Sequence, residues 1–125
     1  MTFQSIIVET EEGVATLTLN RPEKLNAFNP TLLHETAAAI RDMNDDDEIK
    51  VLIITGAGRG FCSGHDFSEP VSGADFNQPG INRRVRLNPF VSYGWMIRQI
   101  DEFAKPVIAA VNGIAAGGGL ALALA

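Results

Sequence analysis

The chain has 125 residues, of which 10 are Lys or Arg and 15 are Asp or Glu, giving a formal net charge of −5. An acidic chain is not drawn to phosphate backbones or anionic membranes by bulk charge, so we expect neither nucleic acid nor a membrane as a partner. Hydrophobic residues make up 46% of the sequence, yet no apolar run reaches the roughly 18 residues of a membrane span. The length suits one domain, or part of one.

Targeting and metal signals are missing from the sequence. The first residues turn acidic before any basic or apolar leader has formed, which predicts a cytoplasmic protein. Cys62 is the single cysteine and the chain has two histidines, so we expect neither an internal disulfide nor a structural zinc site.

The first half of the chain predicts two strands, a helix and a further strand. Residues 3–8 and 14–20 are short β-prone runs that are joined through Gly13, a pattern typical of a hairpin. Apolar residues recur at helical spacing over 30–44. Residues 51–54 are uninterrupted and rich in β-branched side chains, which favours a strand buried on both faces.

The second half begins with a long polar segment over residues 67–87, and a segment of this length is more often a functional or mobile loop than a plain connection. A second amphipathic helix is predicted over 89–103 and another buried strand over 107–111. A third helix is expected from Leu120 to the last residue. It carries no stop signal, so we expect the natural polypeptide to continue.

Eight of the 12 glycines fall in two windows, and each window follows a predicted buried strand. Glycine lets the backbone approach a ligand closely and leaves N–H groups free to hold an anion or a developing oxyanion, although plain turns would also use glycine. The spacing matches neither a dinucleotide-binding fingerprint nor a P-loop. The two windows are Gly56, Gly58, Gly60 and Gly64, and then Gly113, Gly117, Gly118 and Gly119.

Four reactive residue types crowd one turn of the first window: Cys62, Ser63, His65 and Asp66. A nucleophile with His65 as its base is one interpretation. The members of catalytic triads normally converge from separate elements, so we favour the simpler interpretation. On that interpretation Cys62 is a small buried residue and His65 a partly exposed loop residue.

Three segments, in order and at matching spacing, resemble signature blocks of the enoyl-CoA hydratase/isomerase (crotonase) superfamily. They are residues 20–28 (NRPEKLNAF), 56–67 (GAGRGFCSGHDF) and 105–119 (KPVIAAVNGIAAGGG). The resemblance implies an α/β fold in which repeated β-β-α units wind into a spiral, the ClpP/crotonase fold. Residues 1–125 would form the N-terminal part of a single domain of this kind, without its C-terminal part.

The resemblance also implies an acyl-CoA substrate whose thioester oxygen is held by two backbone N–H groups, which fall on Ser63 and Gly118. Two preorganised donors would stabilise an enolate by about 2.7–4 kcal/mol each, by analogy with acyl-transfer enzymes. No cofactor is implied, because coenzyme A is part of the substrate. A homotrimer or a dimer of trimers is implied as the assembly. Residues matching the coenzyme A path are Leu25, Ala27, Gly64, His65 and Asp66, with Lys24 as a phosphate partner.

One position departs from the pattern. Family hydratases carry a glutamate three residues after the oxyanion glycine, where this chain has Ala121. Double-bond isomerisation is therefore favoured over hydration, with the proton carrier expected beyond residue 125 and residues 1–125 expected to be inactive alone. The alternatives are hydration using an acid such as Glu69, thioester hydrolysis, and a catalytically silent subunit that binds acyl-CoA. The dehalogenase branch is disfavoured because its histidine would fall on Gly94.

Overall fold

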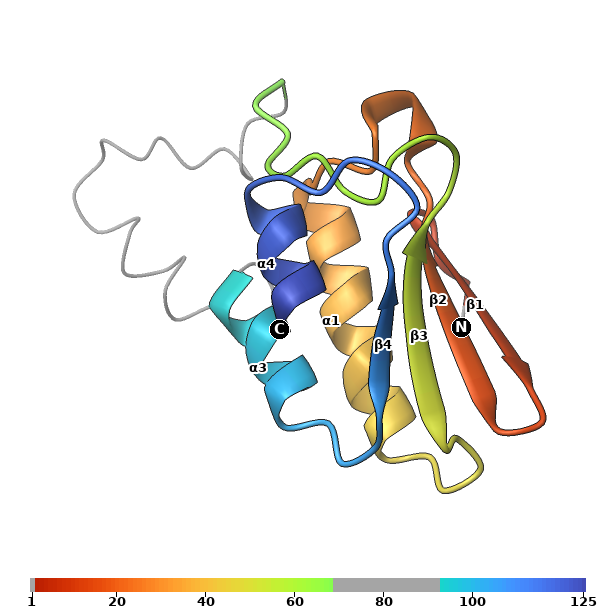
Figure 1. Cartoon of the computed structure of the whole chain (residues 1–125). Coiled ribbons are helices and arrows are strands. Elements are labelled where there is room, and N and C mark those ends of the chain that lie inside the picture. The colour runs from red at the N-terminus through yellow and green to blue at the C-terminus, as the bar shows by residue number, and fades with distance from the viewer. Residues whose placement is uncertain (1, 69–92) are drawn as a thin grey trace.

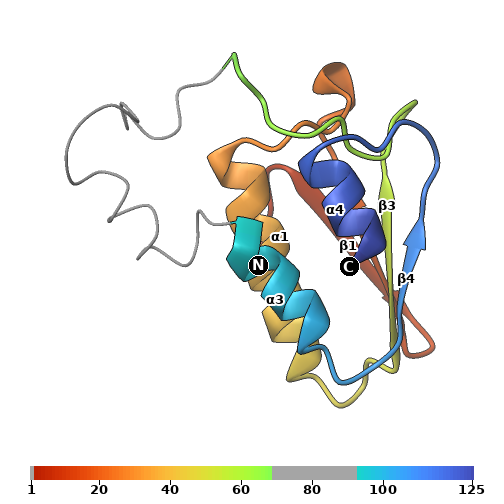
Figure 2. The same ribbon diagram turned by 60° about the vertical axis from the view of Figure 1, so that its left-hand side comes forward.

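The computed structural model describes residues 2–68 and 93–125. They form one four-stranded sheet in the order β1-β2-β3-β4, with helices on one of its faces (Figures 1 and 2). The strands are β1 (Ile6–Glu11), β2 (Val14–Leu19), β3 (Val51–Gly56) and β4 (Val107–Ala110). The sheet is mixed, because β1 and β2 are antiparallel whereas β2, β3 and β4 are parallel.

The predicted hairpin is confirmed, with a shift along the chain. β1 starts at Ile6 and runs on to Glu11, whereas the apolar pattern predicted residues 3–8. The register explains the shift, since Glu11 pairs with Val14 across a turn in which Glu12 and Gly13 have φ of 49° and 82°. Backbone pairing in this tight turn extends the strand through polar residues that the pattern had assigned to the turn.

The core lies between one face of the sheet and the helices. Leu17, Leu19 and Leu52 have no exposed surface, and Ile54 is 2% exposed. The neighbouring residues of β3 alternate with these and are only partly covered. The prediction of a strand buried on both faces is therefore wrong for residues 51–54, because within the described residues the helices cover only one side of the sheet.

Helix α1 (Pro30–Asn44) matches its predicted bounds. Asn29 caps it, because the Asn29 side chain accepts a hydrogen bond from the Leu32 N–H at 2.9 Å, and Pro30 fills the first helical position without losing a bond. The buried face of α1 includes Leu32, Ile40 and Met43. Each such side chain stabilises the fold by about 1.5–3 kcal/mol.

Helix α3 (Tyr93–Asp101) packs on α1 through Met96 and Ile100. The start of the helix predicted over 89–103, and most of the polar segment 67–87, lie outside the described residues. Helix α4 (Gly118–Leu124) begins two residues before the predicted Leu120. Glycines 118 and 119 therefore belong to the helix rather than to the loop in front of it.

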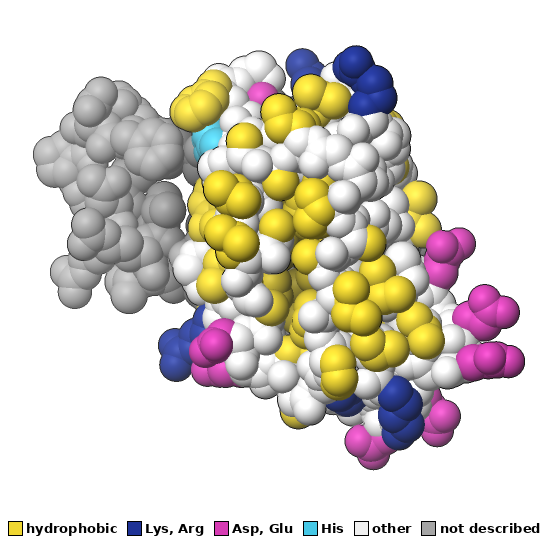
Figure 3. Space-filling view, viewed as in Figure 1, with side chains coloured by type: hydrophobic (Ala, Val, Ile, Leu, Met, Phe, Trp, Pro, Cys, Tyr) yellow, Lys and Arg dark blue, Asp and Glu magenta, His cyan; other side chains and the backbone are white. Residues whose placement is uncertain are grey.

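Apolar side chains gather on the face of the molecule over α4 and β4, while acidic side chains project near the β1–β2 turn (Figure 3). Ile108 of β4 is 51% exposed and Leu124 of α4 is 77% exposed. Across residues 2–68 and 93–125, the helices are too short or too polar to cross a membrane.

Candidate functional site

The C-terminal ends of β2, β3 and β4 meet at one edge of the sheet, and the loops that leave them gather there (Figure 1). Ligand sites of open α/β sheets form at this edge. The three loops are the segments that carry the resemblance, so the fold brings together residues that are far apart in the sequence.

Two of these loops are joined by backbone hydrogen bonds. Cys62 forms a parallel bridge with Ala115, and the N–H groups of Phe61 and Cys62 both donate to the Ile114 carbonyl at 3.0 Å. The Ala116 N–H donates to the Cys62 carbonyl at 3.1 Å. We call residues 60–65 and 113–119, paired in this way, the glycine junction.

Glycine is needed in the junction because the two backbones touch. A Cβ atom added to Gly119 would lie 2.1 Å from the Cys62 carbonyl oxygen. Gly64 has φ of +105°, and a Cβ there would lie 3.0 Å from the Ala116 oxygen. The first turn of α4 therefore rests directly on the chain that follows β3.

The first loop, which follows β2, is tied to the second loop, which follows β3, by a buried ion pair. The Arg21 guanidinium lies 3.1 Å from the Asp66 carboxylate and also donates to the Ala27 carbonyl at 2.5 Å. Asp66 accepts two hydrogen bonds from Ser68, which with the Arg21 contact lower its pKa to about 2. Asp66 is thus ionised at neutral pH.

Asn26 provides a second connection between the loop after β2 and the loop after β3. Its side chain is fully buried, accepts from the Arg21 N–H at 2.8 Å and donates to the carbonyls of Ala57 and Gly60. Leu25 and Asn26 both have left-handed backbones, with φ of 50° and 56°. Such strain is typical of sites where the surrounding contacts hold the chain in place.

Ser63 is hydrogen-bonded to the loop that follows β2. The Ser63 N–H, a predicted oxyanion donor, already donates to the Leu25 carbonyl at 3.0 Å, and its hydroxyl lies 3.3 Å from the Lys24 carbonyl. As an oxyanion donor, Ser63 would have to give up a backbone bond. Within residues 2–68 and 93–125, the N–H groups of Gly118 and His65 donate to no acceptor, and both residues are half-buried.

His65 and Tyr93 meet beside these two N–H groups. The His65 Nδ1 and Tyr93 hydroxyl lie 2.9 Å apart, and the Tyr93 ring packs edge-on against Phe28 with centroids 5.5 Å apart. Burial, and secondly the nearby Cys62, raise the pKa of Tyr93 to about 12. The hydroxyl is therefore protonated at neutral pH, and it can donate to Nδ1 or accept from it, according to the tautomer of the His65 ring.

The remaining residues predicted along the coenzyme A path lie at the same edge. Lys24 is exposed in the short 3₁₀ helix η1 (Pro22–Lys24), next to the half-buried Leu25. The Gly64 carbonyl accepts from the Phe28 N–H at 2.6 Å, and the Asp66 N–H donates to the Phe28 carbonyl at 2.9 Å. These backbone groups thus join the first loop to the second. Their role in binding coenzyme A stays a prediction.

Cys62 is a buried residue of the junction, as expected from the sequence. Burial raises the pKa of its thiol to about 11, against the opposing effect of the Gly64 N–H. A protonated, inaccessible thiol is a poor nucleophile, which argues against a covalent mechanism at this residue.

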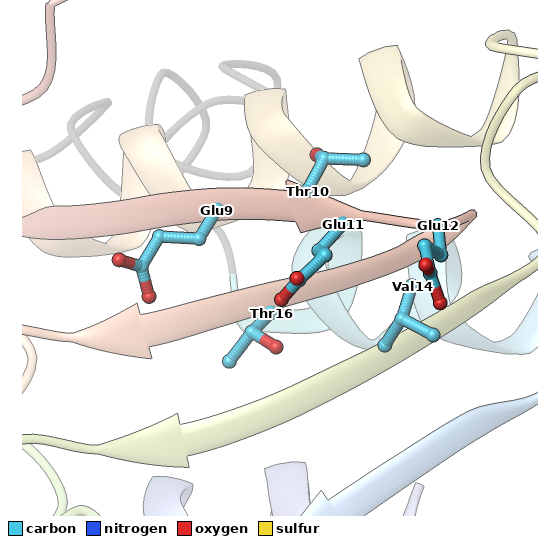
Figure 4. Close-up of a pocket in the computed structure, with 6 residues that line it drawn as sticks. All are labelled: Glu9, Thr10, Glu11, Glu12, Val14 and Thr16. Carbon is cyan, nitrogen blue, oxygen red and sulfur yellow. The ribbon is translucent and has the colours of Figure 1, made fainter.

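A hollow of about 680 Å³ lies at the opposite end of β2, beside the hairpin turn (Figure 4). Glu9, Glu11 and Glu12 line it, so it would repel the phosphates of a coenzyme A substrate. In the part of the chain that the structure describes, no cluster of three or more His, Cys, Asp or Glu side chains could hold a metal ion.

Four residues of the site were not singled out by sequence reasoning: Arg21, Asn26, Tyr93 and Asn112. The Asn112 side chain donates to the Gly56 carbonyl at 2.8 Å and accepts from its N–H at 3.1 Å. Three of the four lie within the resemblance blocks, where a polar side chain beside an apolar strand was an available signal. Tyr93 gave no signal of its own, because its partner His65 is 28 residues away.

A sequence model of the enoyl-CoA hydratase/isomerase family matches residues 9–125. The chain therefore belongs to the enoyl-CoA hydratase/isomerase family. It is 43% identical to the 1,2-epoxyphenylacetyl-CoA isomerase of Escherichia coli over 122 residues, which cover 98% of this chain and 45% of that protein. It is also 38% identical to a probable enoyl-CoA hydratase of Rhodobacter capsulatus, with 100% of this chain and 45% of that protein covered.

Solved structures agree with this assignment. The crystal structure of a putative enoyl-CoA hydratase from Streptomyces coelicolor superimposes with a TM-score of 0.83 at 36% identity, covering 98% of this chain and 43% of that one. An enoyl-CoA hydratase from Bacillus anthracis gives a TM-score of 0.80 at 32% identity, covering 97% of this chain and 45% of that one. The fold is thus the predicted crotonase fold, and the chain spans about 45% of the length of the curated relatives quoted above.

Proposed function

We propose that the protein containing these residues acts on acyl-CoA thioesters and stabilises an enolate at the edge of the sheet where β2, β3 and β4 end. The observation that carries the proposal is the glycine junction, which leaves two half-buried N–H groups, those of Gly118 and His65, without acceptors in the described residues. Paired N–H donors of this kind suit a thioester oxygen that gains negative charge.

His65 takes the place of Ser63 in this proposal because of the bond between the Ser63 N–H and Leu25. Isotope-edited NMR of the whole protein tests the choice, because a hydrogen bond to a thioester oxygen moves an amide proton downfield. Titration with butyryl-CoA should move the amide protons of His65 and Gly118. A shift at Ser63 with none at His65 would restore the original assignment.

Isomerisation is the favoured reaction. A base removes a proton from C2 of a 3-enoyl thioester, the double bond moves from C3–C4 to C2–C3, and a proton is returned to C4, while the N–H groups hold the transient enolate. Ala121 supports this choice, since family hydratases carry a glutamate there. The E. coli relative is also named an isomerase, in its case of 1,2-epoxyphenylacetyl-CoA.

Hydration is the second candidate, supported by relatives named crotonyl-CoA hydratase, from Syntrophomonas wolfei, and probable enoyl-CoA hydratase, from Rhodobacter capsulatus. Lys24 is the proposed phosphate partner in either case, since it is exposed beside the junction. A trimer or a dimer of trimers, the absence of a separate cofactor and a cytoplasmic location remain proposals. One relative, from Arabidopsis thaliana, is named peroxisomal.

Product analysis with the whole protein separates the candidates. Incubation with a 3-enoyl-CoA and with crotonyl-CoA should give double-bond migration in the first and little water addition to the second. Rapid hydration of crotonyl-CoA would favour the second candidate, and release of free coenzyme A would indicate a hydrolase. Binding without turnover would indicate a silent subunit and overturn the proposal of an enzyme.

A further inference from the structure

Tyr93 contacts both residues whose N–H groups we assign to the thioester oxygen. Its hydroxyl lies 2.9 Å from the His65 Nδ1. Its ring packs against Gly118 so closely that a Cβ added there would lie 2.7 Å from the Tyr93 Cε1. Tyr93 belongs to α3, so this side chain links a third element to the two halves of the glycine junction.

We propose that Tyr93 is a positioning residue for the oxyanion site: it sets the placement of the His65 N–H relative to the Gly118 N–H. The proposal rests on the proposed function. It assigns Tyr93 no contact with the reacting atoms, because its hydroxyl is already committed to His65.

The backbone hydrogen bonds of the junction do not by themselves fix the position of the His65 N–H. The hydrogen bonds between its halves are made at Phe61, Cys62 and Ala116, and none of those that join residues 60–65 to 113–119 is made at His65. His65 is held through its flanking residues to Phe28 of the first loop. Tyr93 thus connects the two donors, because its hydroxyl contacts the His65 side chain and its ring packs against Gly118.

The chemistry of the pair suits a fixed rather than a mobile contact. The Tyr93 hydroxyl stays protonated at neutral pH, and because it is both a donor and an acceptor it can keep its hydrogen bond to the His65 Nδ1 in either tautomer of the ring. The two Tyr93 ring contacts, to Phe28 and to Gly118, persist if only the hydroxyl is removed. Tyr93→Phe is therefore a variant that should fold and lose this one contact.

The consequence for catalysis is one of geometry. Oxyanion donors act when they lie about 2.7–3.1 Å from the oxygen, so a small displacement of one donor weakens carbonyl polarisation without weakening the binding of coenzyme A. A neutral hydrogen bond contributes about 0.5–1.5 kcal/mol net, which corresponds to a rate change of about 2- to 12-fold. We expect Tyr93→Phe to lower kcat within that range and to leave KM within about twofold.

The experiment uses the whole protein, with kcat and KM for a 3-enoyl-CoA and the infrared carbonyl frequency of bound butyryl-CoA labelled with ¹³C at the thioester. Tyr93→Phe and His65→Ala should each lower kcat and reduce the shift of the carbonyl band. The double variant should be no worse than His65→Ala alone, and His65→Asn, which keeps a hydrogen-bonding group at the position of Nδ1, should recover part of the loss. His34→Ala, at the exposed histidine of α1, is the matched control.

Three results would overturn the proposal. The first is a Tyr93→Phe variant with the kcat and carbonyl band of the unchanged protein. The second is a double variant whose fold loss of kcat equals the product of the losses in Tyr93→Phe and His65→Ala. The third is a loss of kcat above about a thousandfold with an unchanged carbonyl band, which would make Tyr93 a proton carrier. If the unchanged protein takes up no butyryl-CoA at all, the proposed function fails before any variant is made, and this proposal falls with it.

Discussion

The guanidinium of Arg21 and the carboxylate of Asp66 meet 3.1 Å apart, with 9% and 6% of their side chains exposed, although 45 residues separate them in the sequence. This ion pair joins the loop after β2 to the loop after β3 and so helps to fix the edge of the sheet where the candidate site lies.

Removing one charge of this pair should destabilise the protein strongly. Asp66→Asn keeps the shape of the side chain but removes the negative charge that faces the buried Arg21 guanidinium, so we expect a loss of about 3–5 kcal/mol in the free energy of unfolding. Urea denaturation of the whole protein measures it. The control is Asp42→Asn in the exposed pair of Asp42 with Arg41, where the loss should stay below about 1 kcal/mol. Equal losses in the two variants would contradict the assigned role of the buried pair.

The same carboxylate gives stability a defined pH dependence. The pKa of Asp66 is lowered to about 2 in the folded state, chiefly by hydrogen bonds from Ser68, against about 3.9 in an unfolded chain. Its contribution is therefore fully present above about pH 4 and is lost as the pH falls towards 2. The difference in unfolding free energy between the unchanged protein and Asp66→Asn should shrink over this range. A difference that stays constant from pH 6 to pH 2 would mean that Asp66 does not titrate as described.

Adding one methyl group to the glycine junction should disrupt it. In Gly119→Ala the new Cβ would lie 2.1 Å from the Cys62 carbonyl oxygen, so α4 must move away from the loop that follows β3. We expect a loss of about 3 kcal/mol or more in unfolding free energy, because overpacking against backbone cannot be relieved by a rotamer change. Gly94→Ala, on the exposed side of α3, is the control and should be neutral or stabilising. A stable, active Gly119→Ala protein would show that the junction is looser than the contacts indicate.

Ala121 offers a direct test of reaction choice. Ala121→Glu would place a carboxylate one helical turn after Gly118, where family hydratases carry one. We expect water addition to crotonyl-CoA to rise by about tenfold or more, since general acid–base groups contribute about 10²- to 10⁴-fold when fully positioned. Leu120→Glu places the same carboxylate on the neighbouring exposed residue and should have no such effect. Similar product ratios in both variants would argue that position 121 does not face the substrate.

Residues 1–125 alone should be nearly inactive, because they offer the proposed N–H donors without a positioned proton carrier. This polypeptide should also self-associate, since Ile108, Val111 and Leu124 expose half or more of their surface. Comparing its turnover and sedimentation with those of the whole protein measures both effects. Comparable turnover would place the proton carrier within these residues, and Asp66 and Glu69 would be the first candidates.

β2 and α1 could be predicted because their signals are local. The alternation in β2 and the helical spacing from Leu32 to Met43 each reflect one buried face, and Asn29 with Pro30 marks the start of α1. The bounds of β1 could not be predicted, because they depend on pairing with β2 and not on the hydropathy of β1 itself.

The sequence indicates where the candidate site lies in the fold but not the hydrogen bonds that its residues make. Two glycine windows, each after a strand, indicated the edge of the sheet, and the resemblance supplied Gly118. The assignment of Ser63 failed to anticipate its bond to Leu25, since a hydrogen bond between two loops depends on how the loops dock. The contact between Tyr93 and His65 could not be foreseen for the same reason.

Cys62 can report on the opening of the glycine junction. Its thiol lies beneath the contact with Gly119 and is held protonated by burial, so iodoacetamide should alkylate it only during moments when α4 lifts from the loop after β3. The alkylation rate would then measure the equilibrium population of the open junction. Within residues 1–125 it is the single cysteine, so the adduct is identified by one peptide mass, and an acyl-CoA that closes the junction should slow its appearance.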